Sequence, residues 1–137
     1  MRALSNTEIS KLLYHATFRV NLASIKKLGL GAKQVKNWDI SKTGVVYFSA
    51  DPFTAQSYCE AAENVSDYKY DSGIVVLAVR KPDAANIRFD GNIQGTDNCY
   101  TYGGVLNPNN IYVVCSRHGE LQLVGKLTEL KRVPSFE

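Results

Sequence analysis

Apolar residues recur at helical spacing in one short segment of the first third of the chain. Leu22, Ile25 and Leu28 fall on one face of a helix, which predicts that this face is buried. Asn21 is a favourable N-cap before them, and Gly29 is favourable at the C-terminal end. The pattern therefore predicts a short amphipathic helix that begins after Asn21 and ends before Gly29.

Capping residues mark the starts of two other helices. Ser5 and Glu8 have the spacing of a capping box, in which each side chain accepts a hydrogen bond from the other residue's backbone N–H. Asp51 followed by Pro52 predicts a longer helix that runs to about Ala62, because proline is favoured at the first helical position.

Several segments have the composition of β-strands, with β-branched, aromatic or continuous apolar residues between turn residues. They are residues 13–17, 45–49, 74–79, 87–89, 111–115 and 121–127. The polar stretch 63–72 predicts a loop. Short helices early in the chain and strands late in the chain predict the α+β fold class.

Strand alternation distributes several polar and aromatic side chains between the two faces. His15 and Thr17 share one face of their strand, and Tyr47 and Ser49 share one face of theirs. On the following helix, small residues flank Tyr58 at helical spacing and leave room beside its ring. These positions are candidates for the wall of a ligand cleft.

Length and composition predict one domain that spans residues 1–137, with a hydrophobic core of its own. No apolar run approaches the roughly 18 residues that a membrane-spanning helix needs, and no cleavage signature of a secretory signal is present.

An odd number of cysteines without a Cys-x-x-Cys pair argues against a disulfide framework and against a zinc or other metal site. The cysteines are Cys59, Cys99 and Cys115. We therefore expect a cytoplasmic protein.

Charge is unevenly distributed along the chain. Residues 1–50 hold eight Lys/Arg against two acidic residues, whereas the remainder holds eight against eleven. A basic first third suits a phosphate-bearing ligand or a nucleic acid. A solvated helix face together with a lysine-bearing loop explains the same asymmetry equally well.

The order and spacing of four motifs resemble a known family. The motifs are His15-Ala16-Thr17, Asn21-Leu22-Ala23 with Gly29-Leu30, Gly44-Val45-Val46-Tyr47-Phe48, and Tyr58 eleven residues after Tyr47. They resemble the catalytic domain of the poly(ADP-ribose) polymerase and diphtheria-toxin class of ADP-ribosyltransferases. The resemblance implies two small, mostly antiparallel sheets that enclose a cleft for NAD.

The same resemblance implies a reaction and a role for each motif residue. NAD is the co-substrate, and the bond between nicotinamide and ribose breaks through a transition state like an oxocarbenium ion. His15 would hold a hydroxyl of the adenosine ribose, the backbone of Ala16 would receive the carboxamide, and Tyr47 would stack on nicotinamide opposite Tyr58. Further cofactor contacts are expected from Thr17, Asn21 and Ser49.

Two positions depart from the family pattern. A serine that often binds the carboxamide is replaced by Ala55. A catalytic glutamate before a late strand is replaced by Asn110, which can hydrogen-bond a ribose hydroxyl but supplies no negative charge. We place Asn110 with His15 and Tyr47 as the catalytic residues. Another alignment brings Tyr102 near that place, and Glu120 could supply a carboxylate from the following turn.

Three functions follow from these features. The first is a mono-ADP-ribosyltransferase that releases nicotinamide and modifies a protein or nucleic acid, as a monomer and without membrane association. The second is a module that binds NAD or ADP-ribose with little or no turnover, because the glutamate is missing. The third is an NAD-dependent transferase of the same fold that modifies RNA, for which the basic first third is the only indication.

Overall fold

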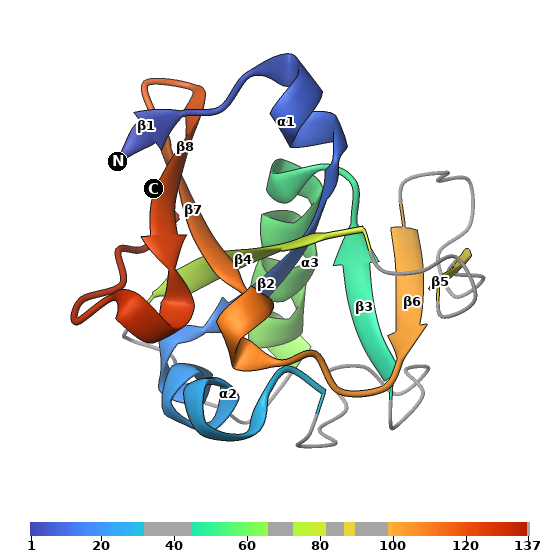
Figure 1. The fold of residues 1–137 in the computed structure, drawn as a ribbon. Helices are drawn as coiled ribbons and strands as arrows, with labels where there is room; N and C mark the ends of the chain where they lie inside the picture. Colours follow the sequence, from blue (N-terminus) through green and yellow to red (C-terminus); the bar gives the residue numbers. More distant parts are fainter. Residues whose placement is uncertain (32–44, 66–72, 82–86, 90–98, 137) are drawn as a thin grey trace.

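The computed structural model describes residues 1–31, 45–65, 73–81, 87–89 and 99–136 (Figure 1). These residues form an α+β fold, in which antiparallel strands make one sheet and a few short helices lie against it. The lysine-bearing loop predicted around Lys33, Lys36 and Lys42 lies outside the described residues.

The described strands are β1 (Arg2–Ala3), β2 (Leu12–Phe18), β3 (Val45–Ser49), β4 (Ile74–Arg80), β5 (Ile87–Phe89), β6 (Cys99–Gly103), β7 (Tyr112–Arg117) and β8 (Glu120–Lys126). The α-helices are α1 (Asn6–Ser10), α2 (Leu22–Leu28) and α3 (Pro52–Val65). Short 3-10 helices are η1 (Arg19–Asn21), η3 (Pro108–Asn110) and η4 (Leu127–Glu129). In the sheet the strands follow the order β1-β8-β7-β4-β2-β3-β6-β5.

The sheet is weakly joined at its middle. β2 pairs with β4 along its whole length, from Leu12 to Phe18, whereas its register with β3 consists of the pair Tyr14↔Ser49. β3 continues instead with β6, to which it pairs from Val45 to Ser49. The structure thus has one hydrogen-bonded sheet where we expected two, and the β2–β3 junction is where that sheet comes closest to dividing.

Each face of the sheet has its own apolar core. On one face, Leu22 and Ile25 of α2 pack with Leu77 of β4 in a cluster that extends to β3 and β7, called the α2 core. On the other face, Ala55 of α3 packs with Tyr14 of β2 in a second cluster, called the α3 core. α3 contacts β2, β3 and β4, and Figure 1 shows it running behind β2 and β4. Helix α3 therefore covers β2 and β3 on one face, and Leu13 of β2 and Phe48 of β3 join the apolar cluster on the other face.

The C-terminal segment is fastened to the sheet between β4 and β7. The Phe136 N–H donates to the carbonyl of Ile74 over 2.9 Å, and the Phe136 carbonyl accepts from Ser116 N–H over 2.6 Å. The Phe136 ring meets Phe53 of α3 edge to face, with 5.2 Å between ring centroids. Burial of Phe136 in the α3 core holds the chain that precedes it, residues 130–135, beside α2.

The predicted helices are largely confirmed. Ser5 and Glu8 form the expected capping box at α1, and α3 begins at Pro52 with Asp51 accepting from the Phe53 N–H. α3 extends three residues beyond the predicted end, to Val65. α2 lies between Asn21 and Gly29 as predicted.

Two details of the α2 prediction were wrong. Leu28 is 53% exposed and lies outside the core cluster that Leu22 and Ile25 join, because two three-residue steps turn it by about 120° around the helix from Leu22. Asn21 precedes α2 but has helical backbone angles and makes no side-chain capping bond, since η1 already leads the chain into the helix.

Strands were predicted correctly where apolar runs are long. The six predicted segments all contain strands, with ends that differ by up to two residues. β1 and β6 were missed: β1 is only two residues long, and the alternating tyrosines of β6 lie between glycine-rich and polar segments. Among the described helices none is long and apolar enough to cross a membrane.

Candidate functional site

His15 and Tyr47, from adjacent strands, meet at the β2–β3 junction. His15 Nδ1 lies 2.8 Å from the backbone oxygen of Tyr47. Because a carbonyl oxygen can only accept, Nδ1 carries the hydrogen and donates it. In the neutral ring Nε2 then has a lone pair, so the imidazole presents an acceptor to any hydroxyl that reaches it.

The surroundings of His15 keep its ring neutral. The ring is half-buried and meets Phe48 edge to face, with 6.0 Å between ring centroids. Burial lowers the pKa of His15 below 6.5, and the hydrogen bond to the Tyr47 carbonyl offsets only part of that effect. At neutral pH the group is therefore an oriented acceptor rather than a cation.

The imidazole also explains why the sheet comes close to dividing here. A ladder hydrogen bond between two strands needs both backbones at about 4.8 Å, but here a histidine side chain supplies the donor to the Tyr47 carbonyl. β3 can then leave β2 after the single pair Tyr14↔Ser49. Ala16, the next residue of β2, is half-buried at this divergence while it still pairs with Val76 on the β4 side.

Tyr47 and Tyr58 lie on the α3 side of the sheet. Val46 and Phe48 are buried in the α2 core, so strand alternation directs the Tyr47 side chain to the opposite face. Tyr58 follows buried Ala55 by three residues on α3, and both tyrosines are half-buried. His15, by contrast, shares the α2-side face of β2 with Leu13. The imidazole and the Tyr47 phenol thus flank the strand divergence from opposite faces.

Thr17 and Asn21 engage each other. Asn21 Nδ2 donates to Thr17 Oγ1 over 3.1 Å, and Thr17 is buried while Asn21 is half-buried. This bond ties the end of β2 to the start of α2. The Asn21 carbonyl oxygen is the polar atom of the pair better suited to a ribose contact, since the hydroxyl of Thr17 is enclosed.

Ser49 and Ala55 contribute to the corner between β3 and α3. Ser49 is 1% exposed, and its hydroxyl accepts from the Asp51 N–H over 3.1 Å. Ala55 is buried against the sheet. The hydroxyl of Ser49 therefore fixes the start of α3, which in turn positions Tyr58.

Asn110 is not adjacent to His15 in the sheet. It is exposed at the end of η3 and is separated from β7 by Ile111, and its backbone N–H donates to the Asn107 carbonyl. β4 lies between β7 and β2, so two strand spacings, about 10 Å, separate the two strands. An extended ligand is needed to contact both side chains.

The two alternatives to Asn110 have different placements. Tyr102 is on β6 opposite Val46 and packs against the α2 core, on the same face of the sheet as His15. Glu120 is exposed at the β7–β8 hairpin, opposite Arg117. Tyr102 is thus on the strand next to β3, near the β2–β3 junction. Glu120 is on β8, which β7 and β4 separate from β2.

Phe48 and Tyr100 were missed as site residues in the sequence. Phe48 contacts the imidazole directly, and Tyr100 of β6 pairs with Phe48 and packs on the same core. Alternation within residues 99–103, once β6 is recognised as a strand, would have placed Tyr100 and Tyr102 on the His15 side.

Among the side chains that the structure describes, no three His, Cys, Asp or Glu residues lie close enough to hold a metal ion. Comparison of this chain with protein-family models, with curated proteins and with solved structures gave no match. The geometry at the β2–β3 junction, together with the sequence motifs, therefore provides the basis for a function.

Proposed function

We propose that the β2–β3 junction binds NAD and that the protein transfers one ADP-ribose unit to an acceptor. The observation that supports this best is the neutral His15 ring, held by the Tyr47 carbonyl with Nε2 as an acceptor. NAD carries several ribose hydroxyls that can donate to such an atom. The divergence of β3 from β2 would be the counterpart of the cleft between the two sheets of an ADP-ribosyltransferase.

Each site residue has a physical task in this proposal. Tyr47 and Tyr58 stack on the two sides of the nicotinamide ring, and each contact contributes on the order of 1 kcal/mol. The backbone of Ala16 binds the carboxamide at the open edge of β2. The side-chain oxygen of Asn21 accepts a hydrogen bond from a ribose hydroxyl. These contacts hold the bond to be broken in one orientation.

In the chemical step the bond between the ribose C1′ and the nicotinamide nitrogen breaks. Nicotinamide leaves as a neutral molecule with the bonding electron pair, and a lone pair of the acceptor forms the new bond to C1′. The acceptor's proton passes to solvent or to a base on the acceptor. Asn110 would hydrogen-bond a ribose hydroxyl without neutralising the positive charge that develops, so we expect a slow enzyme.

A binding module without turnover is the second candidate. Asn110 favours it, because its amide carries no negative charge and lies two strand spacings from His15. Both candidates require NAD affinity that depends on His15. They differ in whether nicotinamide is released.

Labelled NAD and a cell extract as the source of acceptors test the proposal. The wild type should bind NAD, release nicotinamide and transfer the label, and His15→Ala should lose all three by at least tenfold. His118→Asn is the matched control, since His118 is an exposed histidine with φ 53° that asparagine tolerates. Undiminished NAD binding by His15→Ala would refute the proposed site. NAD binding without nicotinamide release would favour the module over the transferase.

A further inference from the structure

A groove with a cationic rim lies beside α2, formed by residues from both ends of the chain. Its volume is about 700 Å³. It is lined by Met1, Arg19, Leu22, Lys26, Val124, Lys131, Arg132, Val133 and Pro134. None of the proposed NAD-contacting residues is among them. The lining thus combines four basic side chains with an apolar floor.

Two of the basic side chains are fixed by the fold. The Arg19 guanidinium donates to the carbonyl of Val133 and, over 3.0 Å, to the hydroxyl of Ser135. The Lys26 ammonium donates to the carbonyl of Leu130 over 2.9 Å. These bonds fix the positions of both side chains at the groove, and the acceptor of the Lys26 ammonium is a neutral carbonyl.

The other two, Lys131 and Arg132, are exposed at the rim. One acidic residue, Glu129, lies close by in η4 and is also exposed. Among the described residues, the lining of the groove includes four basic side chains and no acidic one.

We propose that this groove binds the phosphodiester backbone of a single-stranded nucleic acid. Several cations spaced along a groove match the repeating negative charge of phosphates, and release of counterions favours that contact. The volume of the groove lies in the range of pockets that bind organic ligands, and it exceeds the volume of one phosphate ion. Apolar Leu22, Val124 and Val133 can lie against base or sugar.

The composition of the groove also predicts how binding behaves. Among the described residues of its lining none is aromatic, so these residues offer no platform on which bases stack, unlike many single-strand sites. Affinity then comes mainly from phosphate contacts and shows little sequence preference. The salt dependence should be steep, with a slope of about −0.7 per phosphate contact.

This site is independent of the proposed NAD chemistry. Arg19 comes directly after β2, four residues beyond His15, which corresponds to about 13 Å of extended chain. Binding is measured without NAD and without turnover. A protein inactive toward NAD can still bind nucleic acid here, and failure here leaves the NAD proposal unaffected.

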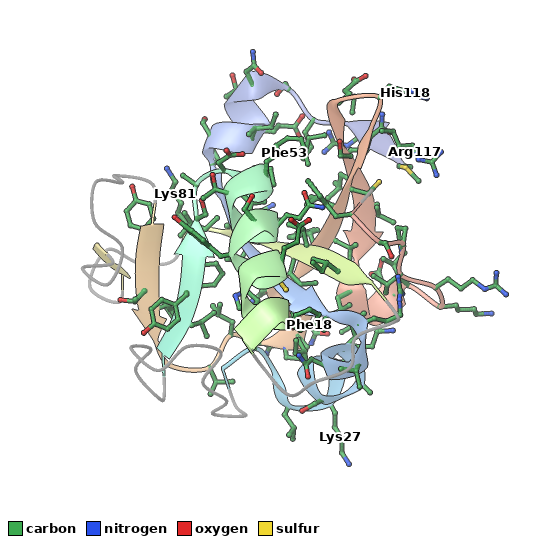
Figure 2. The ribbon with its side chains drawn as sticks, turned by 180° about the vertical axis from the view of Figure 1, so that it is seen from behind. Phe18, Lys27, Phe53, Lys81, Arg117 and His118 are labelled. Atoms are coloured by element: carbon green, nitrogen blue, oxygen red, sulfur yellow. The ribbon has the colours of Figure 1, made fainter. Side chains whose placement is uncertain are left out.

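The test uses fluorescently labelled single-stranded DNA and RNA homopolymers, with anisotropy measured over a salt series. The groove variant is Lys131→Gln with Arg132→Gln, because Arg19 and Lys26 also hold the fold. The control is Arg80→Gln with Lys81→Gln, which removes two equally exposed positive charges beside Lys11. The seven residues of β2 separate that site from Arg19, about 20 Å, and Figure 2 shows Lys81 well apart from Lys27 of α2.

The groove variant should bind on the order of tenfold more weakly at about 0.1 M salt, and its salt slope should be smaller by about 1.4. The control should keep most of the affinity. Equal loss in both variants would mean that bulk charge alone attracts the polymer, and this overturns the site. Absence of nucleic-acid binding overturns it too, as does groove-dependent binding of polyglutamate at equal affinity, which would indicate an acidic protein partner. A preference for RNA or for DNA identifies the source of the phosphodiester.

Discussion

His15 donates a hydrogen bond from Nδ1 to the backbone oxygen of Tyr47, over 2.8 Å, across the junction of β2 and β3. This side chain therefore joins two strands that have a single residue pair in register. The same bond fixes the tautomer and leaves Nε2 as an acceptor. One contact thus serves both the architecture of the sheet and the proposed recognition of a ribose hydroxyl.

The first prediction concerns stability and pH. Because the pKa of His15 is lower in the folded protein than in the unfolded chain, the unfolded chain binds the proton more readily. The stabilising contribution of the neutral His15 ring to the free energy of unfolding is complete above about pH 6.5. It is lost as the pH falls through the pKa of His15 in the folded protein. Free energies of unfolding from urea titrations at pH 7.5 and below 6 should differ, by at most about 1.4 kcal/mol per pH unit.

His15→Gln isolates this effect. The glutamine amide can donate to the Tyr47 carbonyl but does not titrate near neutral pH, so the His15 part of the pH dependence should disappear. His118→Gln, a change of the exposed histidine at the β7–β8 hairpin, should retain it. A pH dependence that follows His118 instead of His15 would show that the His15 ring is not desolvated.

The second prediction concerns the two tyrosines. Tyr47→Ala and Tyr58→Ala should each weaken NAD binding about fivefold, since each removes a stacking contact of about 1 kcal/mol. Tyr47→Phe and Tyr58→Phe keep the ring and should bind within about twofold of the wild type. Isothermal titration calorimetry measures all four. Equal losses in the Phe and Ala variants would mean that the hydroxyls, rather than the rings, matter.

Local signals predicted the helices well, for a physical reason. The capping box of Ser5 and Glu8, and the pair Asp51-Pro52, act within one turn of chain and do not depend on distant contacts. The burial of a side chain depends on contacts with residues that are distant in the sequence, so the local pattern predicts it less well. Leu28 follows Leu22 and Ile25 at helical spacing, but of the three only Leu22 and Ile25 join the buried core.

The order of the sheet and the centre of the site depend on distant pairs. No local pattern specifies that β1 pairs with β8, or that β4 separates β7 from β2. The motif residues were found from spacing along the chain, yet the bond from the His15 ring to the Tyr47 carbonyl requires the register of two strands. Phe48 and Tyr100 became visible only once that register was known.

The third prediction concerns the glycine that ends α2. Gly29 has φ 95° and ψ 165°, a conformation that is essentially restricted to glycine. A Cβ there would also lie 2.5 Å from the carbonyl oxygen of Leu106, which pairs with Leu30. Gly29→Ala should therefore destabilise the protein by at least about 2–3 kcal/mol in urea unfolding.

Gly119→Ala is its matched control. Gly119 has φ 78°, but a Cβ there meets no atom within 4 Å. It should cost only the conformational strain, about 1 kcal/mol. If both variants lost the same stability, the close approach of residue 29 to the chain before η3 would have no energetic weight.

The last prediction concerns the position where the family has a glutamate. Asn110 is exposed, so its replacement should change stability by less than about 0.5 kcal/mol and report on chemistry alone. Asn110→Ala should slow nicotinamide release at nearly unchanged NAD affinity, because a ribose hydrogen bond is lost in the step that breaks the glycosidic bond. Asn110→Glu should accelerate release by at least about tenfold, since a carboxylate stabilises the positive charge that develops on the ribose.

Asn109→Ala is the control, because the neighbouring Asn109 is also exposed and donates to Asn107 from its backbone N–H. Slower release by Asn110→Glu, or an equal effect of Asn109→Ala, would assign the catalytic position to another residue, with Tyr102→Phe the next variant to measure.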